Sequence, residues 1–73
     1  MLGTKKRSVL RGEMAKHGLT LAEMAKVLEL SSVSLSNKIN GRVDFTLSEA
    51  IKVLNFFNSL GESHTIQTLF DIE

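Results

Sequence analysis

The chain of 73 residues contains no cysteine and no proline. Without cysteine, it has neither a disulfide framework nor a cysteine-based zinc site. No apolar run approaches the roughly 18 residues that a membrane-spanning helix needs, and the start of the chain lacks the apolar segment of a signal peptide. We therefore expect a cytoplasmic protein that does not contact a membrane.

The length of the chain favours a single module. We expect one domain, residues 1–73, with no room for a separate ligand-binding or catalytic unit. Hydrophobic residues make up 42% of the sequence, which suffices for one helical core and argues against disorder. There is no internal repeat, linker or low-complexity segment. We expect no cofactor and no small-molecule ligand.

The charges are unevenly distributed along the chain. Residues 1–42 carry eight Lys or Arg against three Glu, which gives +5, whereas residues 43–73 carry one Lys against five acids, which gives −4. These values sum to the net charge of +1. A basic half followed by an acidic half fits a protein with one nucleic-acid-facing side. Ordinary scatter of charged residues over a solvated surface is the alternative.

Residues 20–41 contain the most informative pattern. Thr20 can cap a helix in which Leu21, Met24, Ala25 and Leu28 share one face. Ser31 can cap a second helix with Leu35 and Ile39 facing inward, and Gly41 is typical of a helix end. Small Ala25 permits a close helix crossing, and Leu30 fills the corner. This pattern predicts a helix-turn-helix, whose second helix usually enters the DNA major groove.

The same residues resemble a known family. The run G-L-T-x-x-E-M-A-x-x-L-x-L-S-x-x-S-L-S-x-K-I-N-G-R, followed by F-T-x-S-E, is similar to lambda-repressor-like domains of the Cro/Xre type. The likeness covers about residues 8–60 and is greatest to small phage-type repressors. The family often has Gln, which touches a phosphate, where this chain has Leu21. It often has a turn glycine where this chain has Glu29, so Glu29 must tolerate the turn or the turn differs.

Further helices flank the motif. We expect one over residues 5–16, with Thr4 as its candidate cap and with Gly12 explained by a backbone contact. A capping box at Thr46 and Glu49 opens another over residues 46–60. Its main apolar stripe is expected at Leu47, Ala50, Ile51 and Leu54, and Phe45 anchors the preceding loop. A short helix at about residues 63–71, capped by Ser63, completes an all-α bundle of four to five short helices.

The last two helices carry more apolar residues than one stripe needs. We therefore expect a weak, symmetric homodimer, because one recognition helix reads too few base pairs to select an operator. The alternative is that the tail covers these residues and pairing occurs only on DNA. The candidate dimer surface consists of Phe56, Phe57, Leu60, Ile66, Leu69 and Phe70.

The outward side of the second motif helix supplies the candidate base-reading residues. Asn37 can pair with adenine through its amide, Val33 can contact a thymine methyl, and a serine can bond several bases. The set is Ser32, Val33, Ser34 and Asn37. The alternative for Ser32, Ser34 and Asn37 is that they are ordinary small polar residues on an exposed helix.

Other residues are assigned to phosphates, which set register without reading sequence. They are Thr20, Lys38, Asn40 and Arg42, with Lys5, Lys6 and Arg7 as candidate contacts at the start of the chain. In the family the Lys38 position is often apolar, so its stem can instead pack on the core. Lys5, Lys6 and Arg7 can equally form a flexible arm or a solvated basic end.

The chain shows no pattern typical of an enzyme or a metal protein. The serines of residues 31–36 have no strained turn and no His–acid partner. His17 and His64 lack a helical metal-ligand partner at i, i+4, so we interpret both as surface residues. We expect neither catalysis nor a metal site.

The leading hypothesis is a sequence-specific DNA-binding regulator, a repressor of phage or mobile-element type, as the resemblance implies. A protein-interaction module with the same fold, antitoxin-like or antirepressor, is the second hypothesis. A nucleoid-type binder without sequence preference is a third, which the modest net charge disfavours.

Overall fold

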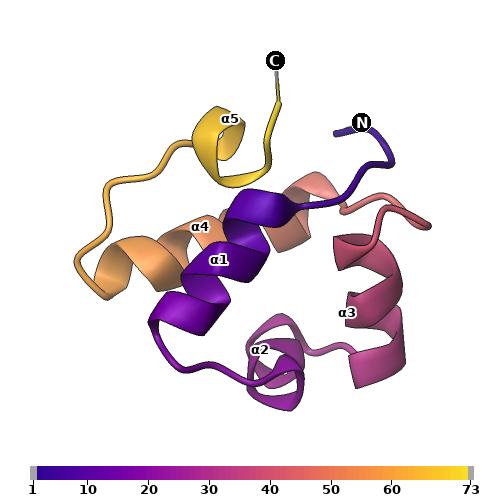
Figure 1. Ribbon diagram of the computed structural model, residues 1–73, viewed down its shortest axis with the longest axis horizontal. Helices are drawn as coiled ribbons and strands as arrows, with labels where there is room; N and C mark the ends of the chain where they lie inside the picture. The colour runs from indigo at the N-terminus through magenta and orange to yellow at the C-terminus, as the bar shows by residue number, and fades with distance from the viewer. Residues whose placement is uncertain (1, 73) are drawn as a thin grey trace.

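The computed structural model describes residues 2–72, which form five α-helices and no strand. These helices are α1 (Ser8–Lys16), α2 (Leu21–Leu28), α3 (Ser32–Ile39), α4 (Leu47–Ser59) and α5 (Ile66–Leu69). In Figure 1, α1 crosses the centre of the view in front of α4, with α2 below and α3 to one side. The predicted all-α class is confirmed. None of the five helices is long and apolar enough to cross a bilayer.

The first helix begins three residues later than predicted. Arg7 has a non-helical backbone, with φ −100° and ψ 74°, and its N–H donates to the Ile39 carbonyl at the end of α3 over 2.9 Å. Residues 2–7 therefore form an N-terminal arm beside α3 instead of a first helical turn. Thr4 is not the cap. The carboxylate of Asp71, near the other end of the chain, accepts from the Val9 N–H over 3.2 Å.

The α2 and α3 helices are joined by three residues and run in clearly different directions (Figure 1). Thr20 caps α2 and Ser31 caps α3, as predicted, and Glu23 adds a reciprocal bond that makes the start of α2 a capping box. Glu29 takes the left-handed conformation, with φ 58° and ψ 38°. It therefore tolerates the turn for which the family often uses glycine, and Leu30 packs against the core beside it.

The α4 helix begins with the predicted capping box of Thr46 and Glu49. Its buried face, however, consists of Ala50, Val53 and Phe57, while Leu47 and Ile51 remain 44% and 43% exposed. The predicted stripe is confirmed at Ala50 and Leu54 and was wrong at Leu47 and Ile51, because α4 is apolar over more than half of its circumference and only its neighbours select the side that packs.

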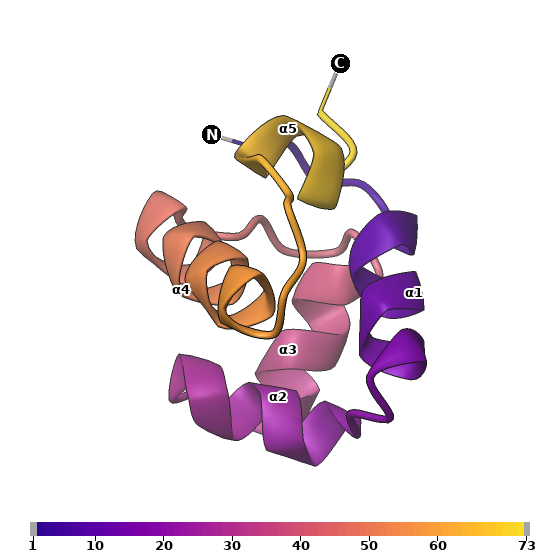
Figure 2. The same ribbon diagram turned by 90° about the vertical axis from the view of Figure 1, so that its left-hand side faces the viewer.

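The tail forms a shorter helix than predicted. Thr65, not Ser63, caps α5, which spans one turn. Figure 2 shows α5 lying across the end of the molecule where α4 and α1 face each other. Leu69 and Phe70 are fully buried there, and the Phe70 ring meets the Phe45 ring edge-on at 5.1 Å between centroids. The tail thus closes one end of the core, and Phe45 anchors its loop as expected.

Candidate nucleic-acid interface

The α3 helix is held by one face and presents the other to solvent. Leu35 and Ile39 are buried, as predicted, whereas the Val33 side chain on the opposite side is 72% exposed. Ser32 is exposed and Asn37 is half-buried. At the first turn of a short helix, Val33 is accessible from outside the chain.

A groove runs along this face between α2 and α3. Its lining includes three of the four predicted base-reading residues and adds Leu21 and Ser36, which were not among them. The lining residues are Leu21, Ser32, Val33, Ser36, Asn37 and Arg42. The Arg42 guanidinium donates to Asn37 Oδ1 over 3.3 Å. The amide and the cation are therefore adjacent and fix each other's orientation.

Two of the predicted hydroxyl contacts already have structural tasks. The Ser34 N–H donates to Ser31 Oγ, and the Ser31 hydroxyl donates to Ser34 Oγ over 3.0 Å. Thr20 Oγ1 accepts from the Glu23 N–H over 3.1 Å. A capping oxygen satisfies a helix-end donor, so a substitution of Thr20 would test helix stability together with binding, and a substitution of Ser34 would remove the acceptor of the Ser31 hydroxyl.

Lys38 leaves the phosphate set. Its ammonium lies 2.9 Å from Glu49 Oε1 and donates to the Asp44 carbonyl over 3.0 Å, and its side chain is 11% exposed. Burial raises the pKa of Glu49, but the Thr46 N–H and the Lys38 ammonium bond to the charged carboxylate and lower the pKa overall. Lys38 therefore links α3 to α4. This agrees with the alternative from the sequence, in which the aliphatic part of Lys38 packs on the core.

Arg7 is a second correction. Its side chain is 1% exposed, and its guanidinium donates to the Phe70 carbonyl over 2.6 Å and to the Gly3 carbonyl. Asp44 Oδ1 lies 3.7 Å from Arg7 Nη2. A buried charge needs such partners. Arg7 thus joins the arm to the tail and does not reach a phosphate, whereas Lys5 and Lys6 are exposed.

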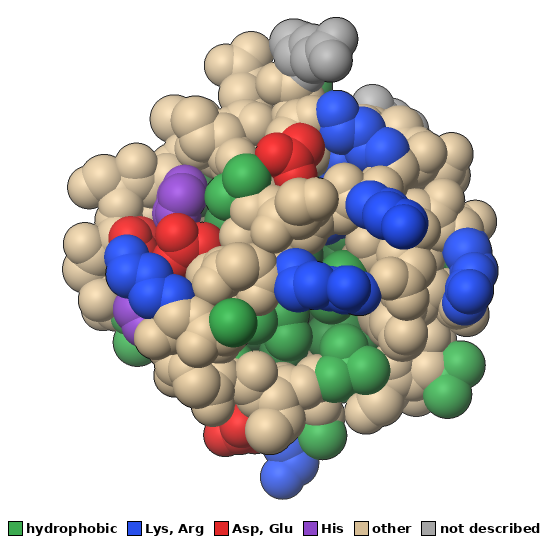
Figure 3. Space-filling model, in the orientation of Figure 1, with side chains coloured by type: hydrophobic (Ala, Val, Ile, Leu, Met, Phe, Trp, Pro, Cys, Tyr) green, Lys and Arg blue, Asp and Glu red, His purple; other side chains and the backbone are tan. Residues whose placement is uncertain are grey.

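Arg11 is a basic residue that sequence reasoning missed. It projects from α1 toward the end of α3 and donates to Asn40 Oδ1 over 2.7 Å. Only the packing of α1 on α3 brings these residues together, so no local signal marks Arg11. With Lys5, Lys6 and Arg42 it forms a rim of exposed cations around α3. Figure 3 shows most of the visible Lys and Arg side chains on the α3 side of the molecule.

Half of the candidate dimer surface is buried inside the chain. Phe57, Leu69 and Phe70 are each 0% exposed, so their assignment to an intermolecular surface was wrong. The tail folds back on α4 and α1, so that its own Leu69 and Phe70 pack into the core together with Phe57. Leu60 is 45% exposed, and Phe56 and Ile66 are half-buried. These three residues remain available to a partner.

Comparison of the chain with protein-family models, curated proteins and solved structures finds no match.

Proposed function

We propose that this protein is a sequence-specific DNA-binding transcriptional regulator that inserts α3 into the major groove. One observation carries the proposal: the outward face of α3 joins exposed Val33 to the amide of Asn37 in a groove that the cation of Arg42 also lines. Apolar and amide groups can read base edges in the major groove, whereas cations neutralise phosphates. The α2–turn–α3 unit would then act as a helix-turn-helix.

The resemblance to phage-type repressors supports a repressor that acts by occupancy. Bound to an operator in the cytoplasm, the protein would block polymerase without catalysing a reaction. Asn37 and Val33 would read bases, with Ser32 at the start of the helix. Lys5, Lys6, Arg11 and Arg42 would contact phosphates on either side, and Asn40, held by Arg11, would reach the backbone beside them.

A dimer would extend the site that is read. Two-fold pairing would set two α3 helices on half-sites about 34–36 Å apart. Such an interface would be built from Phe56, Leu60 and Ile66, the three members of the candidate dimer surface that are not buried. Because three residues form a small surface, we propose weak association that DNA strengthens.

Selection from a pool of random duplexes at two salt concentrations tests the proposal. We expect a defined consensus. Asn37→Ala should then reduce specific binding by about 1–3 kcal/mol. Arg42→Ala should lower the slope of log affinity against log salt by about 1, while Lys52→Ala, which removes a cation from α4, should leave that slope unchanged.

Binding to all duplexes alike would contradict sequence reading, and no binding would contradict a DNA-binding role altogether. The second outcome would favour a protein-interaction module. The observation behind that alternative is the pair Leu47 and Ile51, one helical turn apart on α4 and each more than two-fifths exposed.

A further inference from the structure

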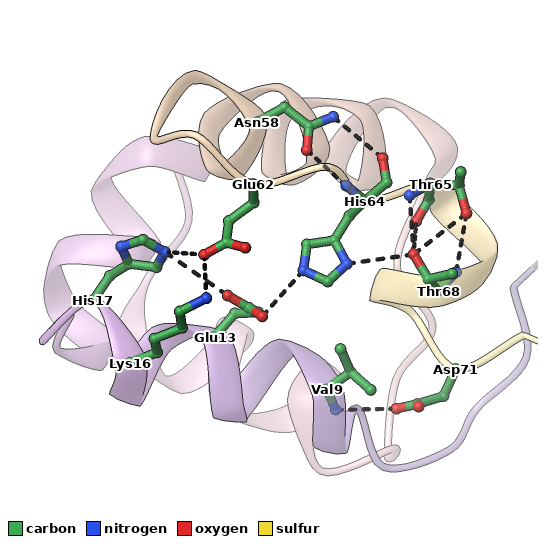
Figure 4. Close-up of polar contacts among 10 residues, drawn as sticks. All are labelled: Val9, Glu13, Lys16, His17, Asn58, Glu62, His64, Thr65, Thr68 and Asp71. Carbon is green, nitrogen blue, oxygen red and sulfur yellow. Dashed lines mark hydrogen bonds and ion pairs between the residues drawn. The ribbon is translucent and has the colours of Figure 1, made fainter.

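Both histidines lie at one seam, where the second half of α1 meets the loop after α4. They were expected on the surface without a helical partner, but the His17 and His64 side chains are only 21% and 17% exposed. Glu13 lies one turn before His17 on α1, and Glu62 reaches the same place from the loop. Figure 4 shows these side chains pointing toward one another from the two segments.

The polar atoms of this cluster are close together. Glu62 Oε2 lies 2.8 Å from His17 Nε2 and 2.7 Å from the Lys16 ammonium. Glu13 Oε2 lies 3.8 Å from the same His17 nitrogen. One ligand atom each from Glu13, His17 and Glu62 can be chosen so that all lie within 4.8 Å of one another. Two carboxylates and an imidazole therefore converge on one point.

The surrounding structure fixes the loop that brings in Glu62 and His64. Gly61 has φ +95°, a conformation that turns the chain back toward α1. The Asn58 side chain then holds His64 by both backbone groups, accepting from its N–H over 3.0 Å and donating to its carbonyl over 3.2 Å. The backbone that carries Glu62 and His64 is thus held in place by contacts within the chain.

His64 orients Glu13 from the other side. Its Nε2 lies 3.1 Å from Glu13 Oε1, and its Nδ1 is 3.3 Å from the Thr68 hydroxyl. The contact to Glu13 has the distance of an ion pair but not the alignment of a hydrogen bond. Among residues 2–72, His64 Nε2 and Glu13 Oε2 are solvent-inaccessible atoms without a hydrogen bond. Glu13 Oε2 is therefore a covered acceptor that faces the cluster and still has capacity to bind.

We propose that Glu13, His17 and Glu62 bind a divalent transition-metal ion, of which Zn²⁺ is the best match. Zinc accepts imidazole nitrogen and carboxylate oxygen together, whereas Mg²⁺ and Ca²⁺ prefer oxygen alone. Zn–N and Zn–O bonds of about 2.0–2.2 Å in a tetrahedron separate ligand atoms by about 3.4 Å. His17 Nε2 lies 2.8 Å from Glu62 Oε2 and 3.8 Å from Glu13 Oε2, which is on either side of that value. Small side-chain rotations would therefore bring the three ligand atoms to the required distances.

Lys16 competes with the metal for Glu62. Its side chain is 59% exposed, so the ammonium can move into solvent when a metal ion takes its place. His64 is a positioning residue that acts through Glu13. The bound ion would connect α1 to the segment that leads into α5. The site lies away from the α3 face, and the inference does not rest on the proposed function.

Titration of tag-free protein with zinc chloride by calorimetry tests the site. We expect saturable binding of one ion per chain. Glu62→Gln, which is nearly isosteric, and His17→Ala should each weaken binding at least about tenfold, and His64→Ala should weaken it by about tenfold, as loss of an orienting partner does. Lys16→Ala should strengthen binding, because it removes the competing cation. Glu29→Gln, which alters an exposed carboxylate outside the cluster, should bind as the wild type does.

Thermal unfolding gives a second readout. Zinc should raise the melting temperature of the wild-type protein but not that of Glu62→Gln, because a ligand stabilises only the folded state that binds it. Binding weaker than about 1 mM, or equal affinity in wild type, His17→Ala and Glu62→Gln, would overturn the proposal and leave the cluster as an ion-pair network.

Discussion

At the scale of single residues, glycines show how differently one residue type can be used. Gly41 has φ +81°, and a Cβ atom there would lie 2.6 Å from the Lys5 backbone carbon. The arm can pass the end of α3 only because this position has no side chain. Gly12, within α1, was expected to serve a similar backbone contact, but a Cβ atom there would meet no atom within 4 Å among the described residues.

These two positions should respond oppositely to the same substitution. Gly12→Ala should raise the free energy of unfolding by about 1 kcal/mol, since alanine is the better helix former and nothing obstructs its methyl group. Gly41→Ala should lower it, because the methyl group meets backbone and the positive φ is strained. Urea unfolding of both variants provides the measurement. Equal effects of the two changes would contradict the packing of the arm on α3.

At the scale of elements, the tail supplies hydrogen-bond acceptors to the start of α1. The α1 helix has no side-chain cap from its own N-cap residue, Arg7. Asp71 supplies the missing acceptor for the Val9 N–H, and Phe70 accepts from Arg7. Each helix end leaves backbone donors that need partners. The segments around Arg7 and Asp71 therefore stabilise each other. No residue near Arg7 in the sequence indicates that its partners come from the tail.

Replacing Asp71 should show this remote cap. Its backbone is left-handed, with φ +56°, which glycine and asparagine tolerate. Asp71→Gly should lower the free energy of unfolding by about 1 kcal/mol, as loss of a capping oxygen does. Asp71→Asn, which keeps an acceptor oxygen and the backbone preference, should stay close to wild type. A decrease of about 4–8 °C in melting temperature for the glycine variant alone is the expected result.

At the scale of the whole molecule, core and surface compete for the same aromatic residues. Phe70 is fully buried against Phe45 and Arg7, so it stabilises the monomer and is not available to a partner. Leu60 is exposed and lies at the end of α4. Substitutions at these two positions separate folding from self-association.

Phe70→Asp should unfold the protein. Loss of a buried phenyl ring costs about 3–5 kcal/mol, and an unpaired buried charge adds to it, against a total stability of about 5–15 kcal/mol for typical proteins. Leu60→Asp should remain folded by circular dichroism and should sediment as a monomer at concentrations where any wild-type dimer forms. A folded Phe70→Asp monomer would instead return Phe70 to the intermolecular surface.

The Glu62 cluster should make stability depend on acidity. Hydrogen bonds from Lys16, and next from His17, lower the pKa of Glu62 to about 2. A carboxylate with a lowered pKa in the folded state contributes stability above its ordinary pKa, and this contribution disappears as the pH falls. In metal-free buffer, wild-type stability should decrease between about pH 5 and pH 2, and Glu62→Gln should decrease less. Parallel decreases in both proteins would exclude Glu62 as a cause.

The sequence by itself determined the features that depend on neighbours along the chain. The helix cap at Thr20 and the capping box of Thr46 with Glu49 are confirmed, because each capping oxygen meets a backbone N–H only three residues away. The inward side of α3 is likewise confirmed, because Leu35 and Ile39 repeat at helical spacing on a helix whose only other apolar residue is Val33. Local geometry suffices in these cases, whatever the rest of the chain does.

Only the tertiary structure decided features that join distant segments. Arg7 and Phe70 are 63 positions apart, and nothing beside Arg7 distinguishes it from the exposed Lys5 and Lys6. The buried side of α4 could not be selected from a helix that is apolar over more than half of its circumference. The meeting of Glu13 and His17 with Glu62 depends on how the α4–α5 loop returns to α1. In each case the contact depends on how separate elements pack against each other. The spacing of residues along a single element does not determine that packing.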